Sequence, residues 1–210
     1  MISVDEALDR IFTRIPTPLP ETVPLGRAHK RVLARPLVAQ HTQPPFDASA
    51  MDGYAVRAAD VEPGKPLFLA GTSQAGARFT GMMQRGECVR IFTGAPLPIG
   101  ADAVIMQEEA RAHGNQVTFE TVPQPGRSVR RKGFDFLAGT ELLPAGVPLT
   151  PAMLNLAAAA NHAELAVTRR PRLAIIATGD ELVPPGAELG PDQIVASNSY
   201  GLTPLLAPYV

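Results

Sequence analysis

Proline and glycine interrupt this chain at short intervals, and that spacing limits the elements that the chain can form. Of its 210 residues, 22 are proline and 18 are glycine. Proline lacks a backbone N–H to donate, and both residues favour turns. The sequence therefore predicts substantial β structure, with few helices and many short elements joined by tight turns.

Short apolar runs recur between residues 44 and 143, and Gly, Pro or Asn stands in nearly every gap between them. The runs are YAVRA, PLFLAG, CVRIFTG, DAVIMQE and QVTFET. Runs of this length, bounded by turn residues, are typical of strands. We therefore expect a β-rich domain in this part of the chain. Residues 22–39 predict two further short strands around a turn or short helix.

Helical periodicity appears at two places. At the N-terminus, apolar residues recur at spacings of three and four, Ser3 and Glu6 form a capping-box pattern, and the prolines from Pro16 onward end the helix. The stretch TPAMLNLAAAANHAEL predicts a second helix, with Thr150 as its N-cap and Pro151 in its first turn.

The pattern changes again after residues 169–172. The run LAIIAT (173–178) is continuously apolar, which predicts a parallel strand covered on both faces. The final segment, QIVASNSYGLTPLLAPYV, predicts a second short strand leading into a helix. We expect the start of an α/β domain that is incomplete within these 210 residues, because an open parallel sheet needs several strands.

Composition excludes several classes of protein. The chain has 19 basic and 20 acidic residues, three tyrosines and no tryptophan, so it lacks the positive field of a nucleic-acid-binding protein. No apolar run approaches the roughly 20 residues of a membrane helix. One cysteine, Cys88, cannot form an internal disulfide, and the N-terminus does not resemble a signal peptide. We expect a soluble protein of the cytoplasm, with neither nucleic acid nor membrane as a partner.

Two motifs in the β-rich region carry groups suited to ligand chemistry. In the first motif, FDASAMDGYAV (46–56), Asp52 either forms a tight turn with Gly53 or binds a hard cation. In the second motif, RIFTGAPLPIGADAV (90–104), Thr93 and the glycine-containing loop either bind an anion or simply end a strand, with Asp102 facing solvent.

Two further motifs follow along the chain. The third motif, SVRRKGFDFLAG (128–139), places Arg130, Arg131 and Lys132 before Asp135, as an oxyanion site or as a solvated basic hairpin. The fourth motif, IIATGDEL (175–182), either places its polar residues at the carboxyl edge of a sheet, where ligands bind, or caps the next element. Its polar residues are Thr178, Gly179, Asp180 and Glu181, and Ser197 with Asn198 follow a second strand and can line the same edge or form a turn.

Taken together, the four motifs resemble those of the MoeA-type molybdopterin molybdenumtransferases, the family that includes the gephyrin E domain. They occur in the same order and at similar spacing, and the resemblance spans nearly the whole chain as the N-terminal portion of the family. It implies a multi-domain α+β protein. The implied parts are an N-terminal helix and linker (1–24), a discontinuous linking domain (25–44 plus 140–167), a β-rich inserted domain (45–139) and an incomplete MogA-like α/β pterin-binding domain (168–210).

The resemblance also implies a function in molybdenum cofactor biosynthesis. The expected reaction transfers molybdenum from molybdate to adenylylated molybdopterin with release of AMP, assisted by Mg²⁺ or another divalent cation. A homodimer is implied, with the active cleft between the α/β domain of one subunit and the β-rich region of the other. A MogA-type adenylyltransferase is a further expected partner. The shortness of the chain relative to the family predicts that these 210 residues alone are inactive.

The resemblance assigns roles to individual residues. The implied catalytic residues are Asp52, Thr93, Asp135 and Glu181, and the three acids among them are the implied metal ligands. The implied substrate-binding residues are Arg130, Arg131, Lys132, Gly179, Asp180, Ser197 and Asn198. The alternative function is a non-catalytic scaffold or binding module of the gephyrin type, which would need an exposed apolar groove.

Overall fold

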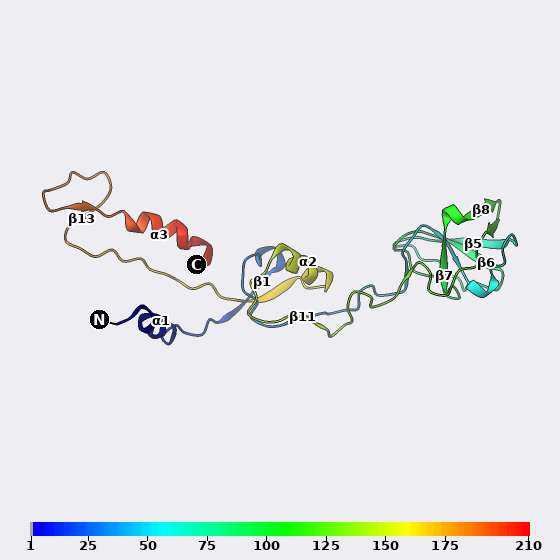
Figure 1. The fold of residues 1–210 in the computed structure, drawn as a ribbon, viewed down its shortest axis with the longest axis horizontal. Coiled ribbons are helices and arrows are strands. Elements are labelled where there is room, and N and C mark those ends of the chain that lie inside the picture. The colour runs from blue at the N-terminus through cyan, green and yellow to red at the C-terminus, as the bar shows by residue number, and fades with distance from the viewer. Residues whose placement is uncertain (1) are drawn as a thin grey trace. The chain divides into compact units, whose positions relative to one another are not determined.

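The computed structural model describes residues 2–210, which form two compact units. Unit 1 contains the residues up to Pro36, Pro144–Leu154 and Ala163–Val210, and unit 2 contains Leu37–Leu143 and Asn155–His162. Figure 1 shows that both units mix helices or helical turns with strands, which confirms the expected α+β class. The four-part domain division implied by the family resemblance stays a prediction.

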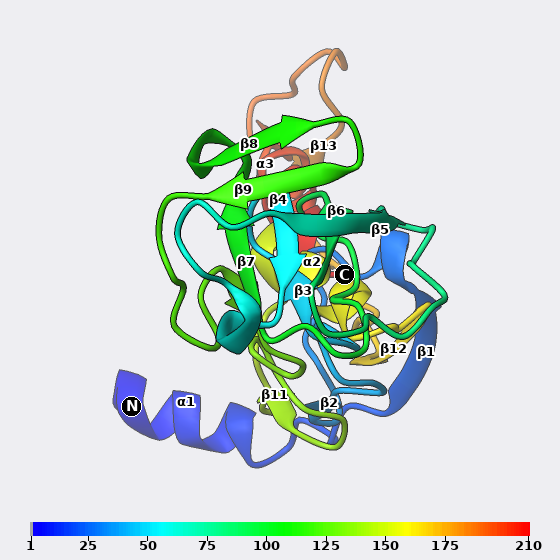
Figure 2. The same cartoon turned by 90° about the vertical axis from the view of Figure 1, so that its right-hand side faces the viewer.

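A six-stranded sheet dominates unit 2, and its strands are labelled in Figures 1 and 2. Its strand order is β7-β4-β6-β5-β9-β8, and only β5 and β6 run parallel to each other. The strands are β4 (Gly53–Val56), β5 (Leu67–Ser73), β6 (Glu87–Ile91), β7 (Ala103–Met106), β8 (Ala110–His113) and β9 (Gln116–Phe119). Five of them coincide with the apolar runs in the sequence, which confirms the prediction of a β-rich region.

The strands β4, β6 and β7 of this sheet are buried on both faces. Along β7, Ala103 and Ile105 belong to one apolar cluster, while Val104 between them belongs to another. Successive side chains of a strand point to opposite faces, so apolar residues at every position give a core on both sides. For this reason the sequences of these strands are continuous apolar runs and do not alternate between apolar and polar residues.

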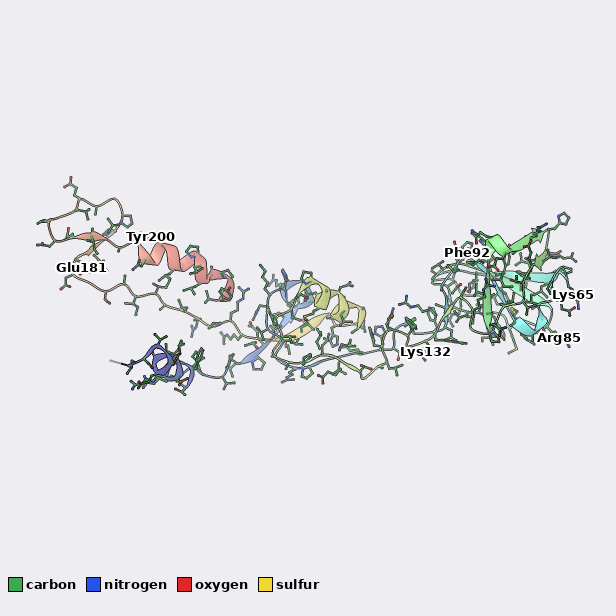
Figure 3. All side chains as sticks on the ribbon, viewed as in Figure 1. Lys65, Arg85, Phe92, Lys132, Glu181 and Tyr200 are labelled. Carbon is green, nitrogen blue, oxygen red and sulfur yellow. The ribbon has the colours of Figure 1, made fainter. Side chains whose placement is uncertain are left out.

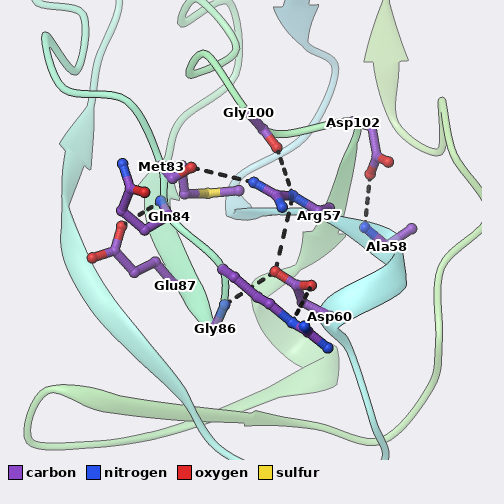
Figure 4. Close-up of polar contacts among 10 residues, drawn as sticks. Arg57, Ala58, Asp60, Met83, Gln84, Gly86, Glu87, Gly100 and Asp102 are labelled. Atoms are coloured by element: carbon purple, nitrogen blue, oxygen red, sulfur yellow. Dashed lines mark hydrogen bonds and ion pairs between the residues drawn. The ribbon is translucent and has the colours of Figure 1, made fainter.

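Polar contacts fix the turn that follows β4 (Figure 4). Asp102 Oδ1 accepts a hydrogen bond of 2.7 Å from the backbone N–H of Ala58. Nearby, Asp60 accepts a 3.0 Å hydrogen bond from Gly86 N–H and lies between the guanidinium groups of Arg57 and Arg85. Asp102 therefore holds the loop and is not the free solvated residue that one interpretation of the second motif predicted.

Short ladders complete unit 2. The strand β3 (Ala48–Ser49) pairs with β10 (Val129–Arg130), and β2 (Leu37–Val38) pairs with β11 (Glu141–Leu143). The helix α2 (Pro151–Ala159) starts in the segment of unit 1 and continues into that of unit 2. Its predicted N-cap is confirmed, because Thr150 Oγ1 accepts a hydrogen bond from Met153 N–H.

Unit 1 begins with the helix α1 (Val4–Phe12), whose predicted cap is also confirmed: Ser3 Oγ accepts from Glu6 N–H. The helix ends before the prolines, at Phe12. The strand β1 (Pro20–Pro24) pairs antiparallel with β12 (Glu164–Thr168). The two short strands predicted within residues 22–39 thus correspond to β1 and β2, but each pairs with a distant segment instead of its neighbour.

The prediction of a strand at residues 173–178 is wrong for the part of the chain that the structure describes. These residues have no strand partner among residues 2–210, and the Ile176 side chain is exposed. A strand needs a hydrogen-bonded neighbour, and an apolar run alone does not provide one. The predicted second strand and helix do form, as β14 (Ile194–Val195) and α3 (Asn198–Leu206), and β14 pairs parallel with β13 (Leu182–Val183). None of the helices formed by residues 2–210 has the length and apolar character needed to span a bilayer.

Candidate functional site

The first three motifs meet in unit 2 through backbone hydrogen bonds around Ser49. Ser49 N–H donates to Ala95 O at 3.0 Å, and Gly94 N–H donates to Ser49 O at 2.8 Å. On the other side, Ser49 pairs with Val129 in the β3–β10 ladder. Segments that are far apart in the sequence therefore form one continuous surface.

Asp52 and Thr93 form the most direct contact between two motifs. Asp52 Oδ1 accepts one hydrogen bond of 2.7 Å from Thr93 N–H and a second of 2.8 Å from Thr93 Oγ1. These two hydrogen bonds, the backbone one first, lower the pKa of Asp52, with a further contribution from the positive charge of Arg90. The Asp52 carboxylate is thus ionised at neutral pH, and no donor among residues 2–210 reaches its Oδ2 atom.

Glycine is required at position 53 for a reason other than the tight turn that was considered for Asp52 and Gly53. It is the first residue of β4 and pairs with Ile91 and Met106 on either side. A Cβ atom at this position would lie 1.9 Å from Ile105 O, which is inside the van der Waals contact distance. Only glycine allows the backbone of β4 to approach β7 this closely, immediately beside Asp52.

The basic residues of the third motif are paired with carboxylates. Arg130 Nη2 donates to Asp135 Oδ1 at 2.6 Å, and Arg131 Nη1 donates to Asp47 Oδ2 at 2.7 Å. Asp47 also accepts from Lys132 N–H at 2.8 Å, and this hydrogen bond, followed by the hydrogen bond and the positive charge of Arg131, lowers the pKa of Asp47. The third motif is consequently neither a bare oxyanion site nor a fully solvated hairpin. The Lys132 side chain, labelled in Figure 3, forms no ion pair with any described residue.

Two cavities open beside Thr93, both lined by unit 2. The first, the Asp135 cavity, has a volume of about 360 Å³ and is lined by Thr93, Gly94, Arg130 and Asp135, among others. The second, the Asp52 cavity, has a volume of about 380 Å³; its lining residues are Met51, Asp52, Thr93, Met106, Gln107 and Glu108. Thr93 lines both cavities, so the predicted residues Asp52, Thr93 and Asp135 occupy neighbouring positions on one surface.

Sequence reasoning missed Arg90. Its guanidinium group lies over the rings of both Tyr54 and Phe92 and donates to Gly53 O and Gln107 Oε1. The signal in the sequence is a charged residue in the middle of the apolar strand CVRIF, with an aromatic residue two positions later. A partly buried arginine of this kind needs acceptors and a stacking surface, which β4 and the Gln107–Glu109 segment supply.

The residues predicted in the C-terminal segment lie in unit 1. Asp180 and Glu181 line a cavity of about 520 Å³ together with residues 190–193. Glu181 directly precedes β13, whereas Ser197 follows β14 and is the N-cap residue of α3 without a side-chain cap bond. Since β13 and β14 run parallel, the two groups lie at opposite ends of this strand pair, and the predicted common edge is not formed. In the part of the chain that the structure describes, the strand expected before the GDEL sequence does not form. The polar residues of that sequence therefore precede the strand β13 instead of following a strand.

The predicted metal ligands do not form a cluster among the residues that the structure describes. Across residues 2–210, no group of three or more His, Cys, Asp or Glu side chains is arranged to hold a metal ion. The predicted ligands Asp52 and Asp135 belong to unit 2 and Glu181 belongs to unit 1. Their convergence on a cation stays a prediction.

Comparison with known proteins identifies the family to which this site belongs. A family model described as the MoeA N-terminal region, domains I and II, matches residues 2–161. The chain belongs to the MoeA family. The matched region includes Asp52, Thr93 and Asp135, and it ends before Glu181.

Similarity to curated relatives supports the assignment of this chain to the MoeA family. The chain is 42% identical to a molybdopterin molybdenumtransferase from a Nostoc species and 38% identical to the one from Haemophilus influenzae, in both cases over 98% of this chain. It is 44% identical, over 87% of its length, to molybdopterin molybdenumtransferase 2 from Mycobacterium tuberculosis. The chain spans 46–52% of the length of these three relatives.

Solved structures of the family agree. A molybdopterin biosynthesis MoeA protein from Pyrococcus horikoshii aligns with a TM-score of 0.87 and 33% identity, over 99% of this chain and 55% of that protein. A second structure of the Pyrococcus horikoshii MoeA protein gives a TM-score of 0.86 at 32% identity, over 97% of this chain and 56% of that one. The fold described above is therefore the fold of MoeA proteins.

Proposed function

We propose that this chain forms the N-terminal part of an enzyme that inserts molybdenum from molybdate into adenylylated molybdopterin, with release of AMP. The observation that carries the proposal is the contact between Asp52 and Thr93, which presents an ionised carboxylate at the mouth of an open cavity. Relatives that are 38–44% identical to the chain are named molybdopterin molybdenumtransferase, which supports this activity.

The charges of the reactants explain why a cation belongs in this proposal. Molybdate and the pyrophosphate link of adenylylated molybdopterin are anionic, so the carboxylates of this surface repel them. Mg²⁺ typically takes one or two carboxylates, retains several waters and bridges to substrate phosphates. Asp52 fits that role because Thr93 occupies only its Oδ1 atom, and Asp135 likewise has only its Oδ1 atom occupied, by Arg130, among residues 2–210. When bound, the cation would offset the negative charge shared by carboxylate and substrate.

The basic residues of the third motif supply the positive charge that the proposal needs for anionic substrates. Arg130 uses one guanidinium nitrogen for Asp135, which leaves other N–H groups for an oxyanion. Lys132 adds a positive charge that forms no ion pair with a described residue. We assign to these residues, with Arg131, the binding of phosphate or molybdate oxygens.

Cys88 is not the source of the sulfur ligands that molybdenum requires. It is buried in the sheet core, and burial raises the pKa of its thiol to about 12. A protonated, enclosed thiol does not coordinate a metal. In the proposed reaction the soft ligands are therefore the dithiolene sulfurs of the pterin, and the protein supplies orientation and charge.

The remaining residues enter the proposal through a second subunit. We propose a cytoplasmic homodimer in which the α/β segment of one subunit, with Gly179, Asp180, Glu181, Ser197 and Asn198, completes the cleft formed by the β-rich region of the other. A MogA-type adenylyltransferase is the proposed source of adenylylated molybdopterin. No measurement on a single chain can replace a test of the assembled dimer, so the decisive experiments use the full-length protein.

Asp52→Asn in the full-length protein tests the proposed activity. The substitution preserves shape and removes the charge, and we expect molybdenum insertion to fall by roughly 100-fold, the scale seen when one preorganised electrostatic group is lost. Insertion is measured by reconstitution of a cofactor-free molybdenum enzyme. Asp9→Asn, on the exposed surface of α1, is the matched control and should leave insertion unchanged. Full molybdenum insertion by Asp52→Asn would contradict the role of Asp52, whereas a parent protein that inserts no molybdenum but binds a partner protein would favour the scaffold alternative.

The isolated chain provides a second test. It spans about half the length of its curated relatives, and we propose that it lacks much of the pterin pocket. The 210-residue chain should therefore show no molybdenum insertion in the same assay. Turnover by the isolated chain would contradict this part of the proposal.

A further inference from the structure

The guanidinium group of Arg90 makes four contacts. It lies in β6, and its guanidinium carbon is 4.8 Å from the ring centre of Phe92 and 5.1 Å from that of Tyr54. In the plane of the group, Nη1 donates to Gly53 O at 3.0 Å and Nη2 donates to Gln107 Oε1. Stacking on aromatic rings combined with two directed hydrogen bonds is a geometry that arginine, and no other side chain, can satisfy.

These contacts surround Asp52 without touching its carboxylate. Gly53, whose carbonyl accepts from Arg90, is the next residue after Asp52. Gln107, the second acceptor of Arg90, uses its backbone N–H to donate to Asp52 O at 3.1 Å. Thr93, which binds the Asp52 carboxylate, lies three residues beyond Arg90 on the same segment. Arg90 thus links the three segments that define where the Asp52 carboxylate lies.

We propose that Arg90 is a positioning residue for the molybdenum-transfer site, which acts by holding the segments of Asp52, Thr93 and Gln107 in one arrangement. This inference rests on the proposed function. Asp52 and Gln107 line the same cavity. A shift of either segment therefore changes the position of the Asp52 carboxylate relative to a bound substrate. Displacements of about 1 Å at a reacting centre can lower turnover by about 100-fold even when the altered residue does not touch substrate.

The alternative is that Arg90 only stabilises the sheet. A purely structural arginine would change the free energy of unfolding and leave the turnover of the folded protein unchanged. A positioning residue instead lowers kcat in protein that is fully folded, and its effect depends on Asp52. The two explanations therefore differ in measurable kinetic quantities.

The test begins with Arg90→Met and Arg90→Lys in the full-length protein, assayed with molybdate and adenylylated molybdopterin. We expect Arg90→Met to lower kcat by about 10- to 100-fold, with KM for both substrates changed by less than about threefold. Arg90→Lys restores the charge but not the paired donors, so it should recover kcat only in part. Arg111→Met is the matched control, because it removes an exposed arginine that pairs with Glu120 on the same sheet, and kcat should not change.

A double-mutant comparison asks whether Arg90 acts through Asp52. If it does, adding Arg90→Met to Asp52→Asn should lower kcat little further, because the carboxylate being positioned is already lost. Independent, multiplicative losses would overturn the inference. The outcome also separates the two proposals: if the parent protein shows no turnover, the proposed function fails, whereas an active parent and an inactive Asp52→Asn beside a fully active Arg90→Met refute only the positioning role.

A spectroscopic measurement complements the kinetics. The Thr93 N–H is hydrogen-bonded to Asp52, so its hydrogen exchange reports on this contact. We expect faster exchange of this amide in Arg90→Met and no change in Arg111→Met. If Arg90→Met does not fold, Gln107→Leu, at an exposed position, removes one of the two acceptors and should produce the same changes in exchange and kcat. Unchanged Thr93 exchange and kcat in the folded variants would overturn the inference.

Discussion

Thr93 donates two hydrogen bonds to the same oxygen of Asp52, although 41 positions separate the two residues. The contact exists because Gly53 of β4 pairs with Ile91 of β6, which brings the residues just before and just after these strands together. It fixes the carboxylate by Oδ1 and leaves Oδ2 without a donor among residues 2–210. The chemistry proposed for this chain depends on that arrangement.

Thr93→Val should weaken the site without removing it. The hydroxyl hydrogen bond is lost and the backbone hydrogen bond remains, so the pKa of Asp52 should rise toward its usual value. In the full-length protein we expect a loss of molybdenum insertion of about tenfold. A carboxyl NMR titration measures the pKa and the insertion assay measures turnover. Thr118→Val, which loses a hydroxyl bond to Arg111 O, should change neither, and an unaltered Asp52 pKa in Thr93→Val would contradict the assignment.

Asp47 should contribute to stability in a pH-dependent way. Its pKa is lowered in the folded chain, first by Lys132 N–H and then by Arg131, so the stabilisation is complete above the usual value of 3.8 and disappears as pH falls through the lower folded-state pKa. Asp47→Asn should lower the free energy of unfolding at neutral pH by about 1 kcal/mol, since the carboxylate is partly exposed. Near pH 3 the difference should shrink.

Urea unfolding of the parent and of Asp47→Asn at several pH values measures this dependence. Glu62→Gln is the control, because Glu62 forms only an exposed pair with Lys65, which Figure 3 labels. Its free energy of unfolding should stay within about 0.5 kcal/mol of the parent at neutral pH. A difference between Asp47→Asn and the parent that stays constant from neutral to acid pH would rule out the charge-dependent role.

Gly53→Ala should disrupt the strand pair that carries Asp52. Its Cβ would lie 1.9 Å from Ile105 O, and relieving this overlap requires β4 and β7 to separate. We expect destabilisation of about 1–3 kcal/mol or more, measured by urea unfolding. Gly26→Ala is the control: nothing lies within 4 Å of the added atom, so stability should change by less than about 0.5 kcal/mol. Equal effects of the two substitutions would show that steric overlap is not the reason for glycine at position 53.

Truncation of a buried side chain in the sheet core should lower the free energy of unfolding, as it does in other protein cores. Ile105 is fully buried, and Ile105→Ala should cost about 2–5 kcal/mol of unfolding free energy. Ile99, 68% exposed, is the matched control, and Ile99→Ala should remain within about 0.5 kcal/mol. Denaturant unfolding of both variants gives the comparison. A small effect of Ile105→Ala would mean that this face of the sheet is not a packed core.

Local features of the fold were predictable because their causes are local. Ser3 and Thr150 cap helices through atoms three residues away, and prolines end α1 soon after its last turn. The short apolar runs became strands because each has suitable residues and turn formers beside it. The run 173–178 shows the limit of this reasoning, since apolar character without a partner strand did not produce a strand.

By itself, the sequence determined five strands of the six-stranded sheet, the caps of α1 and α2, and which motifs mark the MoeA family. Only the tertiary structure decided that Asp52 binds Thr93, that Arg131 reaches Asp47 across 84 positions, and that Arg90 donates to Gly53 O. The physical reason is that hydrogen bonds between distant residues depend on how strands pair. Pairing is chosen by the packing of the whole sheet, and no short stretch of sequence contains that information.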